Sequence, residues 1–360
     1  MSDFLTELRN EVVDAHARHR RRRRLHRAVR PAHPRGWSAR PVLAVAAVLV
    51  ALLAVVISGR FHAAPRPGSP GVSALLRVGG LPLDAAYGDG SLWVSDTGGV
   101  VIRVDPARRR VLARIPTRGN AESIAFAGGR VWVRTLHRGS GTSLVEIDPK
   151  TNRVVARVPA GGDGGIAAGA GAVWSINRYP SSPEDISRIG ASGHGATTHV
   201  PFLRADGIAI EGDIVWAIAH TGTVAQLDGR TGRIVHRWPQ AAASNASTNS
   251  ENVLAPDADG LWVLGTEAPE IVRIEAGHIT RRIPLETAVT QPVLASAADG
   301  LWVAAANHVR ASNSIVRIDP ESGHADATIE LGAHHPTALV PAGHTLCVVT
   351  GDGQVLFVTP

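Results

Sequence analysis

The sequence predicts an all-β protein, a seven-bladed β-propeller with four-stranded blades, preceded by one transmembrane helix. Three observations carry this prediction. A tryptophan-centred strand recurs every 39 to 46 residues, each recurring unit reads as four short strands, and one long segment near the N-terminus has no charge. We therefore divide the chain into a basic cytoplasmic tail (1–40), a transmembrane helix (41–59), a Pro/Gly linker (60–71) and the propeller (72–360).

The segment 41–59, PVLAVAAVLVALLAVVISG, carries no charged residue. As a helix rising ~1.5 Å per residue it spans roughly 28 Å, about the hydrocarbon thickness of a bilayer. Residues 1–40 hold eleven arginines and four acidic residues, so their net charge of +7 leaves −1 for the other 320 residues out of the total of +6. Because basic flanks stay cytoplasmic, we expect a single-pass protein of the cell membrane with an extracytoplasmic propeller. Nucleic-acid binding is not expected of this nearly neutral propeller.

The tail itself has a possible short amphipathic helix, because Leu5, Leu8, Val12 and Ala15 share one helical face. A helix lying on anionic lipid and a docking site for a cytoplasmic partner are both open interpretations. A cleaved signal peptide is the alternative to the anchor. The leader before the apolar segment is long for a signal peptide, and HAA at 62–64 is a poor cleavage site.

The repeat is clearest in its second strand. Six copies centre on tryptophan and the seventh has cysteine: Trp93, Trp132, Trp174, Trp216, Trp262, Trp302 and Cys347. A small apolar strand and a tight glycine-rich turn precede each copy, and an alternating third strand and a fourth strand follow it. Four strands in about 41 residues is the size of a propeller blade.

The two ends of the repeat predict how the ring closes. The last unit stops after its third strand, QVLFVTP, and the strand VSALLRV at 72–78 precedes the first unit without a blade of its own. We expect strand 72–78 to complete the last blade, because this pairing removes two open sheet edges at once.

Each tryptophan occupies the same position in its repeat. This recurrence predicts packing between blades rather than a ligand cage. Cys347 stands at the equivalent position and is predicted to be a buried apolar residue. A single cysteine excludes an intramolecular disulfide.

These repeats, with their G-x-x-W-V and V-x-R-I-D-P strands, resemble the bacterial YVTN-type propellers and the related streptogramin-lyase-like propellers over residues 72–360. The near absence of lysine, present only at Lys150, is typical of a GC-rich bacterial genome. The resemblance implies a propeller fold. It does not fix an activity, because the shared motifs are blade scaffolding.

The predicted binding face is the one that carries the long connections. In a propeller the 2–3 and 4–1 connections share one face, and the irregular segments 134–142, 176–185, 304–313 and 239–252 are of these types, whereas the 1–2 and 3–4 turns are short. Arginine forks and a tyrosine there would suit an anionic polymer or an acidic protein patch. The predicted ligand-binding residues are Arg134, His137, Arg138, Asn177, Arg178, Tyr179 and His308.

Four acidic residues are expected near the channel mouth, at the starts of first strands: Asp84, Glu122, Asp206 and Glu251. They could hold a hard cation, or they could be solvated acids in a hydrated channel. The sequence identifies no cofactor.

Three functions remain open. The first is a non-enzymatic recognition module that binds an extracytoplasmic protein or polymer. The second, implied by the streptogramin-lyase resemblance, is a metal-assisted lyase with a histidine base, for which His308 and His335 would be the candidates. The third is a structural role in an envelope assembly. The sequence alone does not name a ligand or a catalytic residue.

Overall fold

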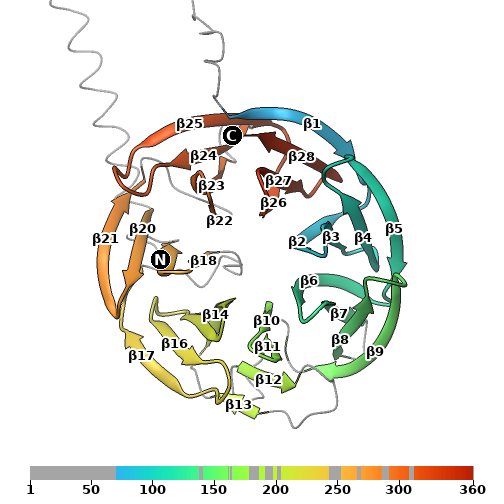
Figure 1. Ribbon diagram of the computed structural model, residues 1–360, viewed down its shortest axis with the longest axis horizontal. Coiled ribbons are helices and arrows are strands. Elements are labelled where there is room, and N and C mark those ends of the chain that lie inside the picture. The colour runs from blue at the N-terminus through green and yellow to red at the C-terminus, as the bar shows by residue number, and fades with distance from the viewer. Residues whose placement is uncertain are drawn as a thin grey trace, which may run out of the picture. The chain divides into compact units, whose positions relative to one another are not determined.

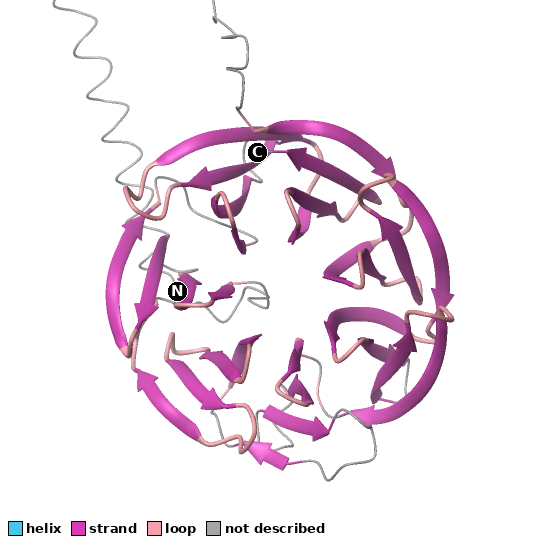
Figure 2. Ribbon diagram, in the orientation of Figure 1, coloured by secondary structure: helices cyan, strands magenta, loops and turns pink. Residues whose placement is uncertain are grey.

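Seven four-stranded antiparallel sheets are arranged in a ring (Figure 1). This computed structural model describes residues 70–359 apart from gaps at 138–140, 161, 163, 178–185, 191–197, 201–203, 243–252, 266–268, 286–291 and 308–311. The described residues form strands and loops (Figure 2), and among them no helix is both long and apolar enough to cross a bilayer. The predicted tail, membrane helix and most of the linker lie outside the described residues.

Each blade contributes four strands, counted outwards from the centre of the ring. The first strands are β2 (Pro82–Gly88), β6 (Asn120–Ala127), β10 (Ile166–Gly169), β14 (Ala205–Glu211), β18 (Leu254–Asp257), β22 (Val293–Ala297) and β26 (Pro336–Ala342). The second strands are β3 (Ser91–Asp96), β7 (Arg130–His137), β11 (Ala172–Ile176), β15 (Ile214–Ala219), β19 (Gly260–Leu264), β23 (Gly300–Asn307) and β27 (Thr345–Thr350). The third strands are β4 (Val100–Asp105), β8 (Gly141–Asp148), β12 (Ile186–Gly190), β16 (Val224–Asp228), β20 (Glu270–Glu275), β24 (Ser312–Ile318) and β28 (Gln354–Thr359). The outer strands are β5 (Arg110–Pro116), β9 (Arg153–Ala160), β13 (Thr198–Val200), β17 (Ile234–Trp238), β21 (His278–Pro284), β25 (Ala325–Gly332) and β1 (Gly71–Arg77).

The ring closes as the sequence predicts. The seventh sheet has the order β1-β28-β27-β26, so its outer strand comes from the start of the domain. Strand β1 pairs with β28 from Gly71 opposite Thr359 to Arg77 opposite Gln354. Both edges that the offset leaves open in sequence are therefore hydrogen-bonded in the fold.

The repeat tryptophans form the packed layers between blades. All six are between 0 and 6% exposed, and Cys347 in the seventh copy is fully buried. Burial raises the pKa of the Cys347 thiol to about 12, which is the behaviour of an apolar core residue. The prediction of a packing role is confirmed for all seven positions.

Tight turns join the first and second strands. Asp89 and Gly90 have φ values of 51° and 64°, and Gly128 and Gly129 have 59° and 69°. Positive φ at both central positions is the geometry that favours asparagine, aspartate or glycine in two-residue hairpins.

Two loop predictions need correction. The segments 134–142 and 304–313 are mostly strand, because β7 extends to His137 and pairs there with Gly141 of β8, and β23 extends to Asn307 and pairs there with Ser312 of β24. Cross-strand hydrogen bonds thus continue beyond the apolar run from which the strand was predicted. The 3–4 connections are also not all short, since β12 ends at Gly190 and β13 begins at Thr198.

Candidate functional site

Blades two and three are neighbours, as the predicted binding face required. The Arg134 side chain, however, is buried between these two blades. Its side chain is 0% exposed on β7. Its Nη2 donates to Ser175 Oγ at 2.9 Å and to the Ile176 carbonyl at 2.7 Å, both on β11 of the next blade. Arg134 is therefore not the exposed loop arginine that the sequence suggested. It is a buried contact between two blades.

His137 and Asn177 also make contacts within the fold. His137 Nε2 lies 3.3 Å from Thr135 Oγ1 and 3.5 Å from Nη1 of Arg157. The pKa of Arg157 is lowered by burial and by the nearby charge of Arg118. Asn177 is buried and its Nδ2 donates to Ser187 Oγ at 2.8 Å. The remaining predicted binding residues lie outside the described part of the chain: Arg138, Arg178, Tyr179 and His308.

Asp84 of the predicted acidic group faces the neighbouring blade. Its Oδ2 accepts hydrogen bonds from Ser123 Oγ at 3.1 Å and from the Ile124 N–H at 3.0 Å, and its Oδ1 accepts one from the Ala85 N–H at 2.8 Å. Ser123 Oγ in turn accepts a bond from the Ile166 N–H at 3.2 Å. A polar chain therefore joins blades one, two and three. Burial raises the pKa of Asp84 to about 6, against the opposing effect of these donors.

The predicted acids do not share one register position. The β2–β3 pairing shifts between Pro82 and Asp84, whereas the equivalent shifts in β6 and β14 fall on either side of Glu122 and Asp206. Asp84 is thus one residue out of step with the other two acids.

Asp206 Oδ2 lies 3.3 Å from Nδ1 of His220, in its own blade. Glu251 lies outside the described residues, and the described residues contain no group of three His, Cys, Asp or Glu side chains placed to hold a metal. The cation site stays a prediction.

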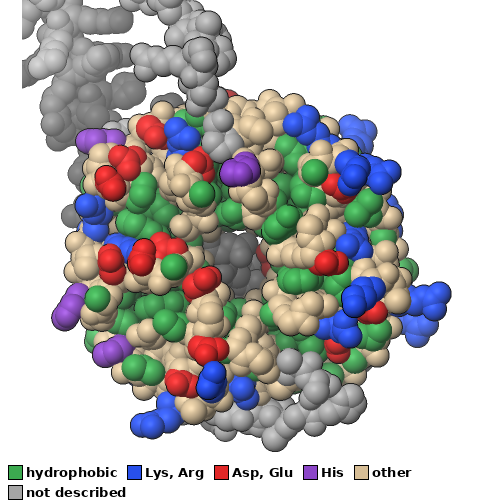
Figure 3. Space-filling model, in the orientation of Figure 1, with side chains coloured by type: hydrophobic (Ala, Val, Ile, Leu, Met, Phe, Trp, Pro, Cys, Tyr) green, Lys and Arg blue, Asp and Glu red, His purple; other side chains and the backbone are tan. Residues whose placement is uncertain are grey.

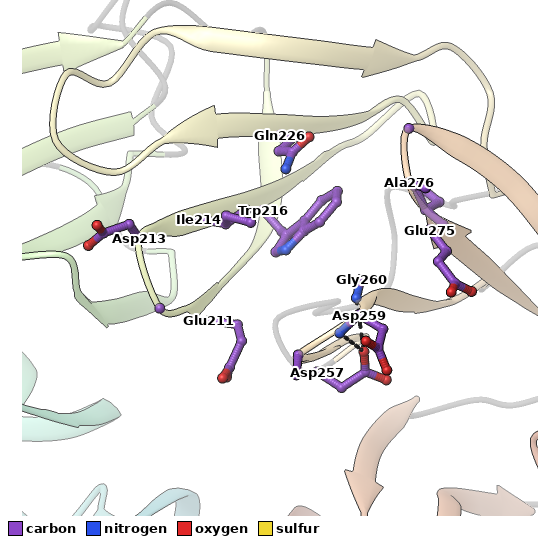
Figure 4. A pocket seen from close by; sticks show the side chains of 14 residues that line it. Glu211, Asp213, Ile214, Trp216, Gln226, Asp257, Asp259, Gly260, Glu275 and Ala276 are labelled. Carbon is purple, nitrogen blue, oxygen red and sulfur yellow. Dashed lines mark hydrogen bonds between the residues drawn. The ribbon is translucent and has the colours of Figure 1, made fainter.

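A pocket that the sequence analysis did not predict lies between blades four and five. It has a volume of about 550 Å³ and is lined by the turn after β14, the turn after β18 and the turn after β20 (Figure 4). Five carboxylates and one indole line it: Glu211, Asp213, Asp257, Asp259, Glu275 and Trp216. These turns are of the 1–2 and 3–4 types, so the pocket opens on the face opposite the predicted one.

The negative charge around this pocket extends over the half of the face in which the pocket lies. In Figure 3, Asp and Glu side chains gather over one half of the ring, the half that contains blades four to six, and most Arg and Lys side chains lie over the other half. A signal for the pocket existed in the sequence. The third strands VVIRVDP and SIVRIDP carry arginine opposite tryptophan, but the corresponding position in blade four is Gln226.

The fold and these inter-blade contacts define a seven-bladed β-propeller, a fold class that hosts many unrelated functions. No protein-family model matches the chain, and no curated protein matches it in sequence. The YVTN-type and streptogramin-lyase-like resemblance therefore stays a prediction.

Solved structures match the fold. The chain is similar to Kuenenia stuttgartiensis hydrazine synthase, with a TM-score of 0.61, 14% identity, and 79% of this chain and 96% of that chain covered. It is equally similar to the β-propeller domain of Myceliophteria thermophila Cps50 (Swd1), with a TM-score of 0.61, 13% identity, and coverage of 81% and 99%. At these identities the likeness shows the propeller fold alone.

Proposed function

We propose that this protein is a membrane-tethered, extracytoplasmic recognition module whose propeller binds a protein partner. The observation that carries the proposal is the order of three parts along the chain. An uncharged segment of nineteen residues, 41–59, follows a strongly basic tail, and a closed propeller follows the segment. A closed ring fixes the strands from which its connections emerge, which lowers the conformational entropy lost on binding.

Topology is tested with external protease on intact cells that express the full-length chain tagged at both ends. We expect the propeller to be removed and the tail to stay protected, because the arginines of residues 1–40 keep that end cytoplasmic. Deletion of 41–59 should release the protein from washed membranes. Protection of residues 72–360 in intact cells would refute the orientation, and unchanged membrane association after the deletion would refute the anchor.

Recognition is tested by crosslinking the full-length protein in its native membrane and comparing it with a chain that lacks 72–360. The proposal requires partners that depend on the propeller. Partners retained by the shortened chain bind the tail, and a set consisting only of such partners would contradict the proposal.

A further inference from the structure

The chain enters the propeller on the face that carries the 1–2 and 3–4 turns. Gly71, the first residue of β1, pairs with Thr359 at the end of the third strand β28, where the other blades have their 3–4 turn. Eleven residues, 60–70, separate β1 from the predicted membrane helix. Fully extended, these residues span at most roughly 36–40 Å. The proposed anchor therefore tethers the propeller by this face.

The 3–4 turn of blade one lies against this entry point. Arg109 of the turn donates hydrogen bonds to the Ser73 carbonyl at 3.4 Å and to Ser73 Oγ at 3.1 Å. Its Cζ lies 5.9 Å from the ring centroid of Phe357 on β28. The turn between β4 and β5 is thus fixed beside the first residues of β1. A membrane that holds the anchor is within reach of this turn.

The 3–4 turns of blades one and two are both basic, and they lie side by side. Arg103 of blade one donates to the Pro149 carbonyl at 2.5 Å and to Asn152 Oδ1 at 3.0 Å, both in the turn of blade two. The two turns read DPARRR at 105–110 and DPKTNR at 148–153. Their exposed basic side chains form what we call the basic turn patch: Arg108, Arg109, Arg110, Lys150 and Arg153.

The aspartate that opens each turn is occupied by the turn itself. Asp105 is 7% exposed and accepts hydrogen bonds from the Arg108 N–H at 2.9 Å and from the Arg108 guanidinium at 3.1 Å. Asp148 accepts from the Lys150 N–H at 3.0 Å and from Thr151 Oγ1 at 3.2 Å. The charge that these two turns present to solvent is therefore mainly positive.

The corresponding parts of blades five and six do not present such a patch. Their turns carry exposed acids, among them Asp259 and Glu321. Arg281 and Arg282 on the outer strand β21 of blade five are exposed as well, but Arg282 pairs with Glu270 at 2.7 Å and Arg281 donates to backbone carbonyls of blade six. The face thus has a basic half at the chain entry and an acidic half away from it (Figure 3).

Exposed apolar side chains accompany the basic turn patch. Val72 and Leu75 on β1 are 41 and 51% exposed, and Leu112 on β5 is 42% exposed. Val72 directly precedes Ser73, with which Arg109 forms its hydrogen bonds. Basic side chains next to exposed apolar ones favour the boundary between anionic headgroups and acyl chains.

We propose that the basic turn patch docks on anionic phospholipid headgroups of the membrane that anchors the protein. The docked propeller has the basic half of its turn-bearing face against the bilayer and the acidic half turned away from it. This inference rests on the proposed membrane anchor, and it specifies which surface of the propeller the anchor leaves accessible to partners. A lipid surface is favoured over a single small anion, because the five charges are spread over two turns and can meet several headgroups at once.

The test places a nitrobenzoxadiazole fluorophore on the full-length protein in vesicles that contain lipids with a nitroxide headgroup, which quenches nearby fluorophores. Two exposed alanines on the same face take the label in separate variants, Ala107→Cys in the turn of blade one and Ala258→Cys in a turn of blade five. The native Cys347 stays unlabelled, because it is fully buried and its pKa is raised to about 12. Vesicles of phosphatidylcholine with phosphatidylglycerol are compared with vesicles of phosphatidylcholine alone.

We expect the Ala107→Cys label to be quenched at least about twofold more strongly in the anionic vesicles than in the neutral ones. The difference should disappear at about 1 M salt, where the Debye length falls to about 3 Å. The Ala258→Cys label should show neither the stronger quenching nor the salt dependence, because it lies in the acidic half.

Variants assign the effect to the patch. In the Ala107→Cys background, Arg110→Gln combined with Arg153→Gln should reduce quenching in anionic vesicles to about the level of neutral vesicles. The matched control is Arg230→Gln combined with Arg233→Gln, which removes two charges from the 3–4 turn of blade four and should leave the quenching unchanged.

Equal quenching of the Ala107→Cys label in neutral and anionic vesicles would overturn the inference, and so would equal quenching of the two labels. Shielding of the Ala107→Cys label that follows protein concentration rather than anionic lipid would identify a second copy of the chain as the occupant, and would overturn the assignment to lipid. Flotation of the vesicles separates these failures from failure of the anchor. Protein that floats without the expected quenching contradicts the docking alone, whereas protein that does not float with the vesicles contradicts the anchor and the docking together.

Discussion

Replacing Arg134 by alanine would remove the buried guanidinium that joins blade two to blade three. The side chain is 0% exposed and donates two hydrogen bonds across the joint, at 2.9 and 2.7 Å. Hydrogen bonds from a charged donor contribute about 1.5–3 kcal/mol each, which gives about 3–6 kcal/mol for the pair. Release of the buried charge offsets part of this loss, so we expect a net destabilisation of about 3 kcal/mol.

The assay is urea unfolding of the full-length protein in detergent, followed by tryptophan fluorescence. Arg130→Ala is the matched control, because Arg130 lies on the same strand but is 41% exposed and should cost less than about 1 kcal/mol. Arg134→Met, which keeps much of the volume without the charge, should lose less than Arg134→Ala. Equal stability of Arg134→Ala and Arg130→Ala would refute the inference that Arg134 holds the two blades together.

Two further predictions concern titration and ring closure. Because the folded pKa of Asp84 is about 6 and its ordinary value is 3.8, its contribution to stability is fully present below about pH 4 and is lost as pH rises through 6. The loss amounts to about 2–3 kcal/mol, so Asp84→Asn should flatten the pH dependence of the urea midpoint between about pH 4 and pH 7, and parallel curves for the two proteins would contradict the assignment. Deleting β1 (Gly71–Arg77) should expose the edge of β28 and cause aggregation on mild heating, whereas deleting part of the linker, residues 60–69, should not. An unchanged melting temperature without β1 would show that the closure contributes little.

Local patterns in the sequence were sufficient to predict the ring. The number of blades follows from the seven-fold recurrence of one strand, and the closure follows from a strand without a blade at one end and a blade without an outer strand at the other. The burial of Trp93 or Cys347 follows from their place in a strand that has neighbours on both sides. The blade count and the burial depend on period and turn chemistry, which act over a few dozen residues, whereas the closure depends on pairing two open edges at the opposite ends of the domain.

The site depended on contacts between blades, which the repeat pattern does not encode. Arginine is usually a surface residue, yet the hydrogen-bond partners of Arg134 lie on the next blade, 41 and 42 residues away. Asp84 lies one residue after the bulge of its strand, whereas Glu122 occupies the bulge of its own strand, and the hydrogen-bond partners Ser123 and Ile124 of Asp84 belong to the next blade. The pocket beside Trp216 is lined by turns of blades four and five, which come together only in the folded ring. The sequence by itself thus determined the scaffold, because each blade repeats the same local rules. Only the tertiary structure decided which charges are buried, paired or left facing a pocket, because those outcomes depend on which side chains meet across the joints between blades.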